Sequence, residues 1–463
     1  MVNGGINGDL AARLRQAVDE VGPSVRADLE LLVAIPSVSA AGVDTPALWA
    51  SAEAVAELLR GAGCQLVDVV TGGGSRPAVI GHRPGPAGAP TVLLYAHHDV
   101  QPTGDHELWS TDPFSPQERG GRLYGRGAAD DKAGIAVYLC ALRAFDLISE
   151  PIPVSVSVFI EGEEEIGSPA LAAFLTEHGH RLRADVVVLA DAVNWAIGVP
   201  ALTTTLRGIV DCTVSLRTLD HPVHSGMFGG PAPDALTAMC RLLATLHDEQ
   251  GEVAIGGLLP AGLTWQEADP LDMDEARFRV ESGLLDGTHL LGSGSVTSRL
   301  WTKPAVTVLA IDGPRVGEAA NVLQAAVRAT VSMRVPAGID GQHAMAALTT
   351  HLQSHAPWGA EVSVEAGDTG EATKIATDGP AFAAARRAFA AAWGTKPAIV
   401  GVGGSIPFIG ILQRALPQAE FLVTGVEDPD SRAHGADESL HLGEFARACL
   451  AHTLLLAELG ERD

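Results

Sequence analysis

The chain has 463 residues, of which 46% are hydrophobic, and carries a formal net charge of −25 at pH 7. This length exceeds that of one ordinary domain, so we expect two domains with ample cores. The acidic balance argues against nucleic acid or an anionic membrane as a partner, and the five scattered cysteines are typical of a reduced, intracellular protein. The chain start lacks the basic and apolar regions of a signal peptide, and the most apolar run, 398–412, is short and interrupted, so we expect a cytoplasmic protein.

The first part of the chain alternates between helical and strand-like patterns. Apolar residues at helical spacing predict helices over 8–34 (with a break near Gly22-Pro23), 45–62 and 133–147. Runs of β-branched and apolar residues predict strands over 64–70, 91–97, 154–160 and 184–190. This order predicts an α/β protein, with a mainly parallel sheet between layers of helices.

The pattern changes after residue 208. Strands and amphipathic helices then follow in the order βαββαβ, the plan of a ferredoxin-like domain: 209–217, 233–248, 305–311, 326–335, 341–355 and 361–365. Beyond residue 368 the patterns of the first part return, with helices over 381–393 and 442–459 and a strand over 421–426. We therefore predict a discontinuous α/β/α domain, residues 1–208 and 368–463, into which residues 209–367 are inserted as a second domain.

An acidic segment, EGEEEIGS (161–168), directly follows a predicted buried strand. Its Ser168 and the following Pro169 predict the N-cap and the first residue of a helix. Three consecutive acids therefore lie at the carboxyl end of a strand, the edge at which open α/β sheets bind ligands: Glu163, Glu164 and Glu165. A solvated acidic turn is the alternative interpretation.

Other imidazole and carboxylate side chains also follow predicted strands or precede the third helix: His97, Asp99, Asp130, Asp131, Asp191 and His434. Each has an ordinary alternative, such as a turn aspartate, an acid at a helix start or a surface histidine. Together, without a thiolate, they give the ligand mix of zinc, or of cobalt or manganese. Such a metal can lower the pKa of a bound water to about 7, and a neighbouring carboxylate can take its proton.

The chain resembles the di-zinc metallopeptidase family that includes aminoacylase, glutamate carboxypeptidases, succinyl-diaminopimelate desuccinylase and carnosinase. The segments that carry the resemblance stand in family order: YAHHDVQP, LYGRGAADDKAG, EGEEEIGS, VVVLAD, HSGMFGG, VSMRVP, GGSIP and RAHGADE. The chain looks closest to the branch of cytosolic nonspecific dipeptidase and carnosinase. The resemblance implies a catalytic α/β/α domain and an inserted lid and dimerisation domain.

The resemblance implies two divalent metal ions per chain, zinc first and cobalt or manganese as substitutes. Asp130 would bridge the ions. The first ion would be completed by His97 and Asp191. The second would be completed by Glu165 and His434. The peptide bond between the bridging aspartate and the next residue is cis in this family.

The resemblance also gives the acid–base residues. Asp99 would orient His97, as carboxylates do beside metal-bound imidazoles. Glu164 would be the general base that accepts a proton from the activated water. In a homodimer, His224 would enter the neighbouring active site and stabilise the tetrahedral oxyanion.

The substrate contacts implied by the resemblance lie mainly in the inserted domain. The Arg334 guanidinium would hold the C-terminal carboxylate of a small peptide with two parallel hydrogen bonds. Asn321 and Ser405 would add further substrate contacts. The free amino group of the peptide needs an acidic neighbour, for which Glu163 or Asp131 could serve.

These expectations describe a metallo-dipeptidase. The alternatives are an amidohydrolase of N-acyl or N-carbamoyl amino acids with the same site, and a binding protein without turnover. The complete set of expected ligands argues against the last. Two departures leave the specificity open: Gly401-Val402 stands where this branch often has Arg-Glu, and Gln324 stands where it usually has proline.

Overall fold

The computed structural model describes residues 6–40, 46–258, 271, 273–404 and 407–461. The chain forms two compact units: unit 1 comprises Met1–Thr204, Ile375–Val400 and Ile411–Asp463, and unit 2 comprises Thr205–Lys374 and Gly401–Gly410. The chain passes between the units within β8 (Ala201–Leu206), β16 (Ala398–Val402) and α11 (Pro407–Ala415), and again directly after Lys374. Residues 401–410, which we predicted in the first domain, thus belong to unit 2, where a Cβ on Gly401 would lie 2.7 Å from the Thr205 and Trp301 side chains.

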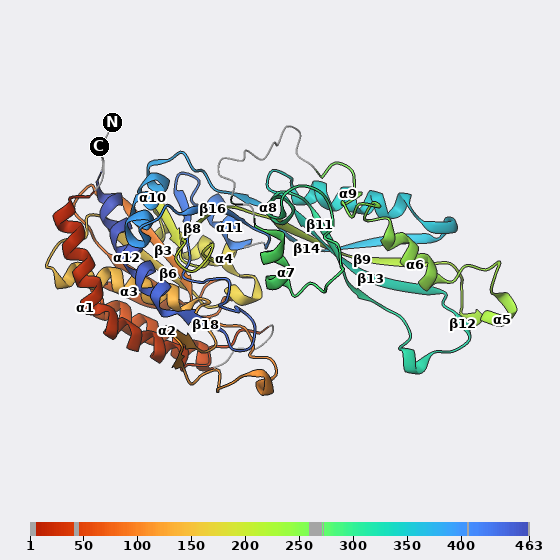
Figure 1. Ribbon diagram of the computed structural model, residues 1–463, viewed down its shortest axis with the longest axis horizontal. Helices are drawn as coiled ribbons and strands as arrows, with labels where there is room; N and C mark the ends of the chain where they lie inside the picture. The colour runs from red at the N-terminus through yellow and green to blue at the C-terminus, as the bar shows by residue number, and fades with distance from the viewer. Residues whose placement is uncertain (1–5, 41–45, 259–270, 272, 405–406, 462–463) are drawn as a thin grey trace. The chain divides into compact units, whose positions relative to one another are not determined.

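Unit 1 is built on a mixed sheet with a parallel centre (Figure 1). The parallel strands follow one another in the order β6 (Ser155–Glu161), β3 (Thr91–His97), β7 (Val186–Leu189) and β17 (Glu420–Val423). Antiparallel strands extend the sheet on both sides: β2 (Ala78–Arg83) and β1 (Leu66–Val70) beyond β6, and β8 beyond β17. A small separate sheet contains β4 (Gln117–Arg119), β5 (Arg122–Tyr124) and β18 (Ser439–His441). The parallel centre confirms the α/β class, while β2 has no counterpart among the predicted strands.

Helices bury the apolar strands of unit 1 in one continuous core. They are α1 (Gly8–Val33), α2 (Pro46–Gly61), α3 (Lys132–Leu147), α10 (Pro380–Trp393) and α12 (Leu442–Gly460), of which α1, α3 and α12 lie side by side in Figure 1. The predicted break in the first helix is wrong, because α1 continues through Pro23. Proline costs a helix one backbone hydrogen bond, but buried residues on both sides of it, such as Leu14 and Leu29, keep the helix packed against the core.

The acidic segment forms a short 3-10 helix, η2 (Glu164–Ile166), before α4 (Leu171–His178). The predicted cap is therefore wrong, since Ser168 and Pro169 precede the helix and Ala170 is its N-cap residue. The Glu163 carboxylate instead accepts a hydrogen bond from the Ala170 N–H at 2.9 Å. Glu163, seven residues earlier in the chain, thus accepts the N–H group that a capping side chain would otherwise bind at the helix start.

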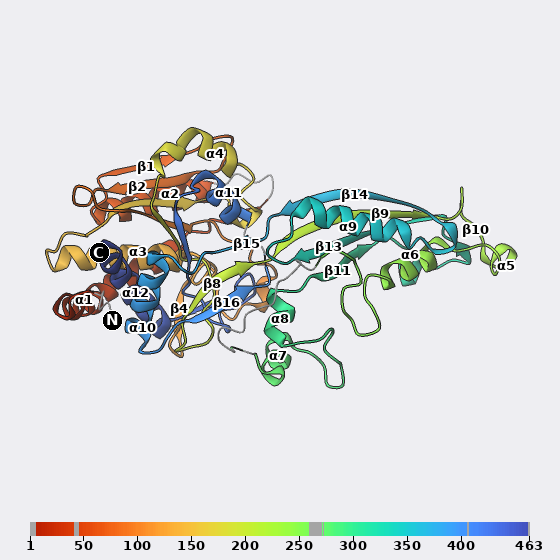
Figure 2. The ribbon, with the colours of Figure 1, turned by 90° about the horizontal axis from the view of Figure 1, so that it is seen from above.

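Unit 2 contains an antiparallel sheet in the order β11 (Ala305–Ile311), β13 (Ala326–Val335), β9 (Gly208–Arg217) and β14 (Glu361–Gly370). Helices α6 (Ala235–Ala244) and α9 (Gly341–Ser354) pack on one face of this sheet (Figure 2). The chain order β9-α6-β11-β13-α9-β14 is the predicted βαββαβ plan. Shorter elements complete the unit: β10 (Val223–His224), α5 (Ser225–Phe228), α7 (Glu275–Ser282), α8 (Val296–Trp301), β12 (Val322–Leu323) and β15 (Thr373–Lys374).

Candidate metal centre

The carboxyl ends of the parallel strands bring the predicted acidic and imidazole side chains to one edge of the unit 1 sheet. His97 ends β3 and pairs with Glu161 at the end of β6. Leu189 of β7 pairs with Tyr95 of β3 and with Val423 of β17, so Asp191 lies level with His97 along the strands. Parallel pairing therefore positions residues from distant parts of the chain at the same depth.

Two groups of potential ligands form at this edge, and they share Asp130. One group is His97, Asp130 and Asp191, and the other is Asp130, Glu165 and His434; in each, one donor atom per residue lies within 4.8 Å of the others. The Asp130 Oδ1 atom lies 3.1 Å from the His97 Nε2 atom, and its Oδ2 atom lies 3.0 Å from the His434 Nε2 atom. The two oxygens of one carboxylate thus face the two groups separately. The peptide bond Asp130–Asp131 is cis, as expected.

Asp99 connects His97 to the acidic turn. The His97 Nδ1 atom lies 2.9 Å from the Asp99 backbone oxygen and 3.5 Å from its carboxylate. The same carboxylate accepts hydrogen bonds from the N–H groups of Glu164, at 3.3 Å, and Glu165, at 3.1 Å. Asp99 therefore fixes both the imidazole ring and the turn that carries the neighbouring acids.

Glu164 lies beside the first ligand group without belonging to it. Its Oε2 atom is 3.9 Å from the His97 Nε2 atom. Burial raises the pKa of Glu164 to about 8, helped by the negative charges of Glu165 and Asp130 and opposed by His97. A carboxyl group in such surroundings has a high proton affinity, which is what a general base requires.

Two residues that were not expected from the sequence hold the ligands in place. The Gln101 side-chain amide donates to the Glu165 carboxylate at 2.8 Å, and the Gln101 N–H donates to its other oxygen at 3.0 Å. The Glu438 carboxylate pairs with Arg126 at 2.6 Å and accepts the N–H groups of Ala129 and Asp130. Gln101 lies in the segment VQP and Glu438 in the segment GADE. Their short distance in sequence from Asp99 and His434 could have identified them as residues that support the ligands.

Glu163 and Asp131 are unsuited to the role that we suggested for them, the recognition of an amino group. The Glu163 oxygens accept the N–H groups of Arg76, at 3.1 Å, and of Ala170. Asp131 is 1% exposed and accepts the His97 N–H at 3.2 Å. Both acids therefore support the local backbone.

The charge balance of this edge fits divalent cations. Four carboxylates and two imidazoles make up the ligand groups and the adjacent base, and burial raises the pKa of Asp191 well above its usual range. Asp130 and Glu165 raise the pKa of His434 to about 10 by hydrogen bonding. A metal ion needs the neutral imidazole, so its binding would replace this proton and neutralise the crowded acids. Oxygen and nitrogen donors without thiolate suit zinc, cobalt or manganese.

Two of the remaining predicted residues lie together in unit 2. His224 is exposed, and its Nδ1 atom accepts the Gly226 N–H at 3.0 Å. Strand β10 pairs with β12, with His224 opposite Val322, and the Ser225 N–H donates to the Asn321 oxygen at 2.9 Å. His224 and Asn321 are therefore neighbours.

Arg334 lies near the other end of the same sheet. Strand β13 begins at Ala326, beyond β12, and Arg334 is its second-last residue. Since a strand rises about 3.3 Å per residue, eight residues separate the two ends by about 26 Å. Within one chain, Arg334 and Asn321 thus cannot contact the same dipeptide, which spans about 7 Å. Ser405, the last predicted contact, lies outside the described residues.

Arg334 shares its end of the sheet with a second guanidinium. Arg207, two residues before the Ile209 that pairs with Arg334, donates to the backbone oxygens of Gly403 at 3.0 Å and Lys303 at 3.2 Å. Burial and the charge of Arg334 lower the pKa of Arg207 to about 10. A Cβ on Gly403 would lie 2.9 Å from the Arg207 guanidinium, so a residue without a side chain fits at this first glycine of the GGSIP segment.

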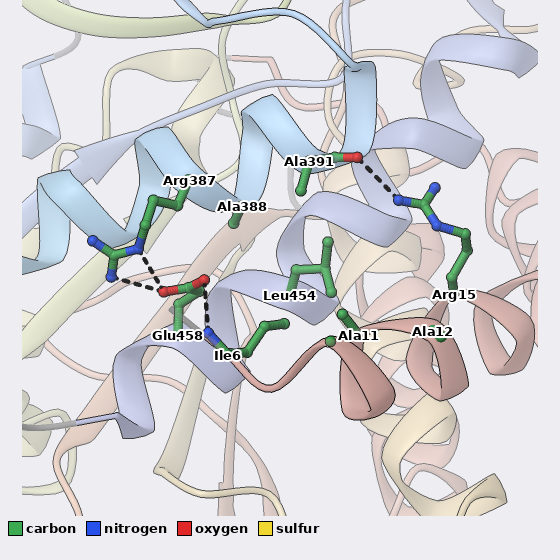
Figure 3. A pocket seen from close by; sticks show the side chains of 10 residues that line it. Ile6, Ala11, Ala12, Arg15, Arg387, Ala388, Ala391, Leu454 and Glu458 are labelled. Carbon is green, nitrogen blue, oxygen red and sulfur yellow. Dashed lines mark hydrogen bonds and ion pairs between the residues drawn. The ribbon is translucent and has the colours of Figure 1, made fainter. Parts of the chain in front are cut away.

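A separate pocket of about 460 Å³ lies between α1, α10 and α12 (Figure 3). The Glu458 carboxylate in it pairs with Arg387 at 2.7 Å and accepts the Ile6 N–H, and Arg15 donates to the Ala391 oxygen at 3.0 Å. Its charged side chains thus have partners, and none of its lining residues belongs to a ligand group.

The sequence is similar to a known peptidase family and to characterised dipeptidases. Residues 93–458 match the family described as Peptidase family M20/M25/M40. The cysteinylglycine-S-conjugate dipeptidase of Corynebacterium striatum is 36% identical over 389 residues, which cover 83% of this chain and 84% of that protein. The Beta-Ala-His dipeptidase of Homo sapiens is 27% identical over 388 residues, covering 80% of this chain and 75% of that protein.

A solved structure shares the fold over nearly the whole chain. The di-peptidase Dug1p from Saccharomyces cerevisiae matches with a TM-score of 0.81 at 22% identity, covering 98% of this chain and 99% of that one. At this level of identity, the likeness shows the fold alone.

Proposed function

This chain belongs to peptidase family M20/M25/M40 and is a metal-dependent dipeptidase, and from that membership we propose that its site would hold two divalent ions and that Glu164 takes the proton of the water that cleaves the amide bond. The family resemblance expected from the motifs is thereby confirmed, including its dipeptidase branch. We propose zinc as the native ion, with cobalt or manganese able to use the same ligands. When bound, such ions lower the pKa of a water molecule to about 7.

The observation that carries this proposal is the position of Asp130 between the two ligand groups. One of its oxygens faces His97 and the other faces His434. A carboxylate shared in this way would suit a site for two divalent ions. We propose His97 and Asp191 as the further ligands of one ion.

The other ion takes Glu165 and His434 in this proposal. Gln101 holds Glu165 by two hydrogen bonds, so this ligand is positioned before an ion binds. Asp99 orients His97 and the turn at 164–165 together. Glu164 accepts the proton of the attacking water and gives it to the leaving amine.

We propose a homodimer in which His224 acts on the site of the partner. The position of Arg334 near one end of β13 supports this arrangement, because the other end, which Asn321 precedes in the chain, lies about 26 Å away, too far for one dipeptide to reach. Next to His224, the α5 side chains Met227 and Phe228 are 76% and 51% exposed. Exposed apolar residues beside a histidine that we expect to act on another chain are typical of an association surface.

Arg334 binds the C-terminal carboxylate of the substrate in this proposal. Its neighbour Arg207 donates hydrogen bonds to backbone oxygens and adds positive charge beside it.

The part of the chain that the structure describes contains no helix with the length and hydropathy of a membrane span. We propose a cytoplasmic location from the reduced cysteines, all five of which are free.

The deciding experiment combines metal titration with a substrate panel. Protein purified without chelator should bind close to two divalent ions per chain and hydrolyse free dipeptides, including cysteinylglycine and β-alanylhistidine. Matched N-acetyl amino acids and C-terminal amides should be poor substrates. Full activity at one ion per chain would contradict the paired site, and faster turnover of N-acetyl amino acids would establish the amidohydrolase alternative.

The dimer has its own test. His224→Ala and Glu164→Gln should each be inactive, and mixing them with subunit exchange should restore activity, because one site of each mixed dimer is intact. Size-exclusion and labelled-subunit exchange establish that mixed dimers exist. If they form without recovery of activity, His224 does not act on the partner.

A further inference from the structure

A buried acid at the edge of the unit 1 sheet belongs to neither ligand group. Glu427 follows β17, is 7% exposed, and forms a parallel bridge with Val193, two residues beyond Asp191. Its backbone oxygen accepts the Asn194 N–H at 2.9 Å, which fixes the extended chain at this point. The preceding Val426 is buried in the apolar core, so alternation along the extended chain turns Glu427 away from that core.

The carboxylate of Glu427 has no hydrogen-bond donor and no ion-pair partner among the described side chains and N–H groups. The charged groups that act on it are Asp130, Glu438, Asp131 and His434. Three of these are acids, and two of the four belong to the proposed ligand set. Glu427 thus faces the metal edge, where burial and these neighbouring acids raise the pKa of its carboxyl group well above the usual range.

Other buried acids of this edge that lie outside the ligand groups have donors. Glu161 accepts the Tyr95 hydroxyl at 2.7 Å, and Glu438 accepts Arg126. Asp428, the next residue along the chain, pairs with both ends of the Arg122 guanidinium at 2.9 and 3.0 Å. Among the residues that the structure describes, each of these acids has a donor for at least one oxygen, although Glu161 Oε1 is itself without a partner, whereas Glu427 has a donor for neither oxygen. A cationic group from outside the chain would offset the cost of burying its charged form.

We propose that Glu427 binds the free α-amino group of the substrate. This inference rests on the proposed dipeptidase function and adds the recognition of the amino end to it. An ammonium group supplies the missing positive charge and up to three donors. The two acids that the sequence suggested for this role differ from Glu427: both Glu163 oxygens accept backbone N–H groups, and Asp131 is 1% exposed and accepts the His97 N–H with one oxygen.

The same acid would reject blocked substrates. When an N-acyl amino acid binds, the Glu427 carboxylate is buried without a cation, and sites that leave a buried polar group unpaired discriminate strongly against the analogue that lacks the partner. Glu427 therefore favours free dipeptides over the N-acyl substrates of the alternative reading.

The test compares two substrates that differ only in the amino group, L-alanyl-L-alanine and N-propionyl-L-alanine. Glu427→Gln should lower kcat/KM for the dipeptide by about 10- to 100-fold, since hydrogen bonds to charged groups have this effect. For N-propionyl-L-alanine, kcat/KM should change by less than about threefold, and the metal content should stay the same. An equal loss on both substrates, or loss of a metal ion, would overturn the proposal.

Asp428→Asn is the matched control. It weakens the pair with Arg122 on the same loop without changing the charge that faces the metal edge, so it should affect both substrates alike. If Asp428→Asn reproduces the selectivity of Glu427→Gln, the effect comes from the loop and the proposal is wrong.

A binding measurement separates this proposal from the dipeptidase function itself. Phosphinic analogues of alanyl-alanine, with and without the amino group, are titrated into the metal-loaded enzyme by calorimetry. Wild type should prefer the amino analogue by tenfold or more, and Glu427→Gln should reduce this ratio towards one. A wild-type ratio near one, in an enzyme that hydrolyses dipeptides, would overturn the role of Glu427 and leave the proposed function standing.

Discussion

The two sheets of this molecule differ in how much of them is covered. In unit 1, β3, β6 and β7 are buried almost throughout, whereas in unit 2 buried and half-buried residues alternate along β9. A sheet covered on both faces offers only its strand ends for chemistry, while a sheet with one open face offers that face and its edges. The difference explains where the proposed residues lie: the proposed metal ligands follow strand ends in unit 1, and the proposed substrate contact Arg334 lies within a strand of unit 2.

The two units also differ in the sign of their buried charge. The functional edge of unit 1 concentrates acids, including Asp130, Asp191 and Glu427. The open face of unit 2 has two neighbouring guanidinium groups at one end, Arg207 and Arg334.

Removal of the shared ligand should give the largest effect. Asp130→Ala takes a donor from both ligand groups at once, so metal content should fall and kcat/KM should drop by about 10³-fold or more, since a metal ion contributes several kcal/mol to the transition state. Metal analysis and dipeptide kinetics measure this. Asp146→Ala, which removes an exposed acid paired with Arg83, should stay within about twofold of wild type. If Asp130→Ala kept the metal content of wild type, Asp130 would not be a shared ligand, and it would differ in no way from an acid such as Asp146.

Replacement of the base should leave the metals in place. Glu164→Gln keeps the size of the side chain but cannot accept a proton, so kcat should fall by about 10²–10⁴-fold with unchanged metal content. Glu163→Gln is the matched comparison, because Glu163 holds two N–H groups and has no proton-transfer role in our proposal. It should lower thermal stability more than kcat. The reverse ranking of the two variants in kcat would make Glu163 the base.

The anion-binding end of unit 2 should give an intermediate effect. Arg334→Lys keeps the charge but loses the paired hydrogen bonds, so kcat/KM for dipeptides should fall by about 10- to 100-fold. The loss should be smaller for C-terminal amides, which lack the carboxylate. Arg328→Lys, an exposed change on the same strand and face, is the control and should have no such selectivity. Equal losses on acids and amides would show that Arg334 stabilises the sheet and does not bind the substrate.

The fold was largely predictable because its strands carry clear patterns. The run 91–97 is apolar throughout and forms the buried β3, and the alternating run 209–217 lies within the half-open β9. The errors occurred where local rules competed with contacts from elsewhere. Pro23 remains inside α1 because the helix is held by the core, and Ser168 loses the capping position to the carboxylate of Glu163.

The site was predictable as far as its residues follow strands. His97, Asp130 and Glu165 come together as their motifs suggested, although their roles remain proposals. Gln101 and Glu438 escaped notice because their functions depend on contacts with residues tens or hundreds of positions away. Glu427 escaped because only the structure shows that it is buried without a partner. The separation of Asn321 from Arg334 likewise needed the strand register.

The smallest effect on catalysis should come from the apolar core of unit 2. Leu348 of α9 is fully buried in a cluster with Val210 and Met333, separate from the core cluster of unit 1. Leu348→Ala should lower the free energy of unfolding of unit 2 by about 2–5 kcal/mol, through lost burial and the cavity left behind. Hydrogen exchange should become faster in β9, β13 and α9, while α3 and β3 of unit 1 keep their protection and the metal content equals that of wild type. At 25 °C, kcat/KM should remain within about twofold of wild type, because no residue of either ligand group is touched. Equal loss of protection in both units would show that the two cores unfold together. The units would then differ in the functional residues that they carry but not in their stability.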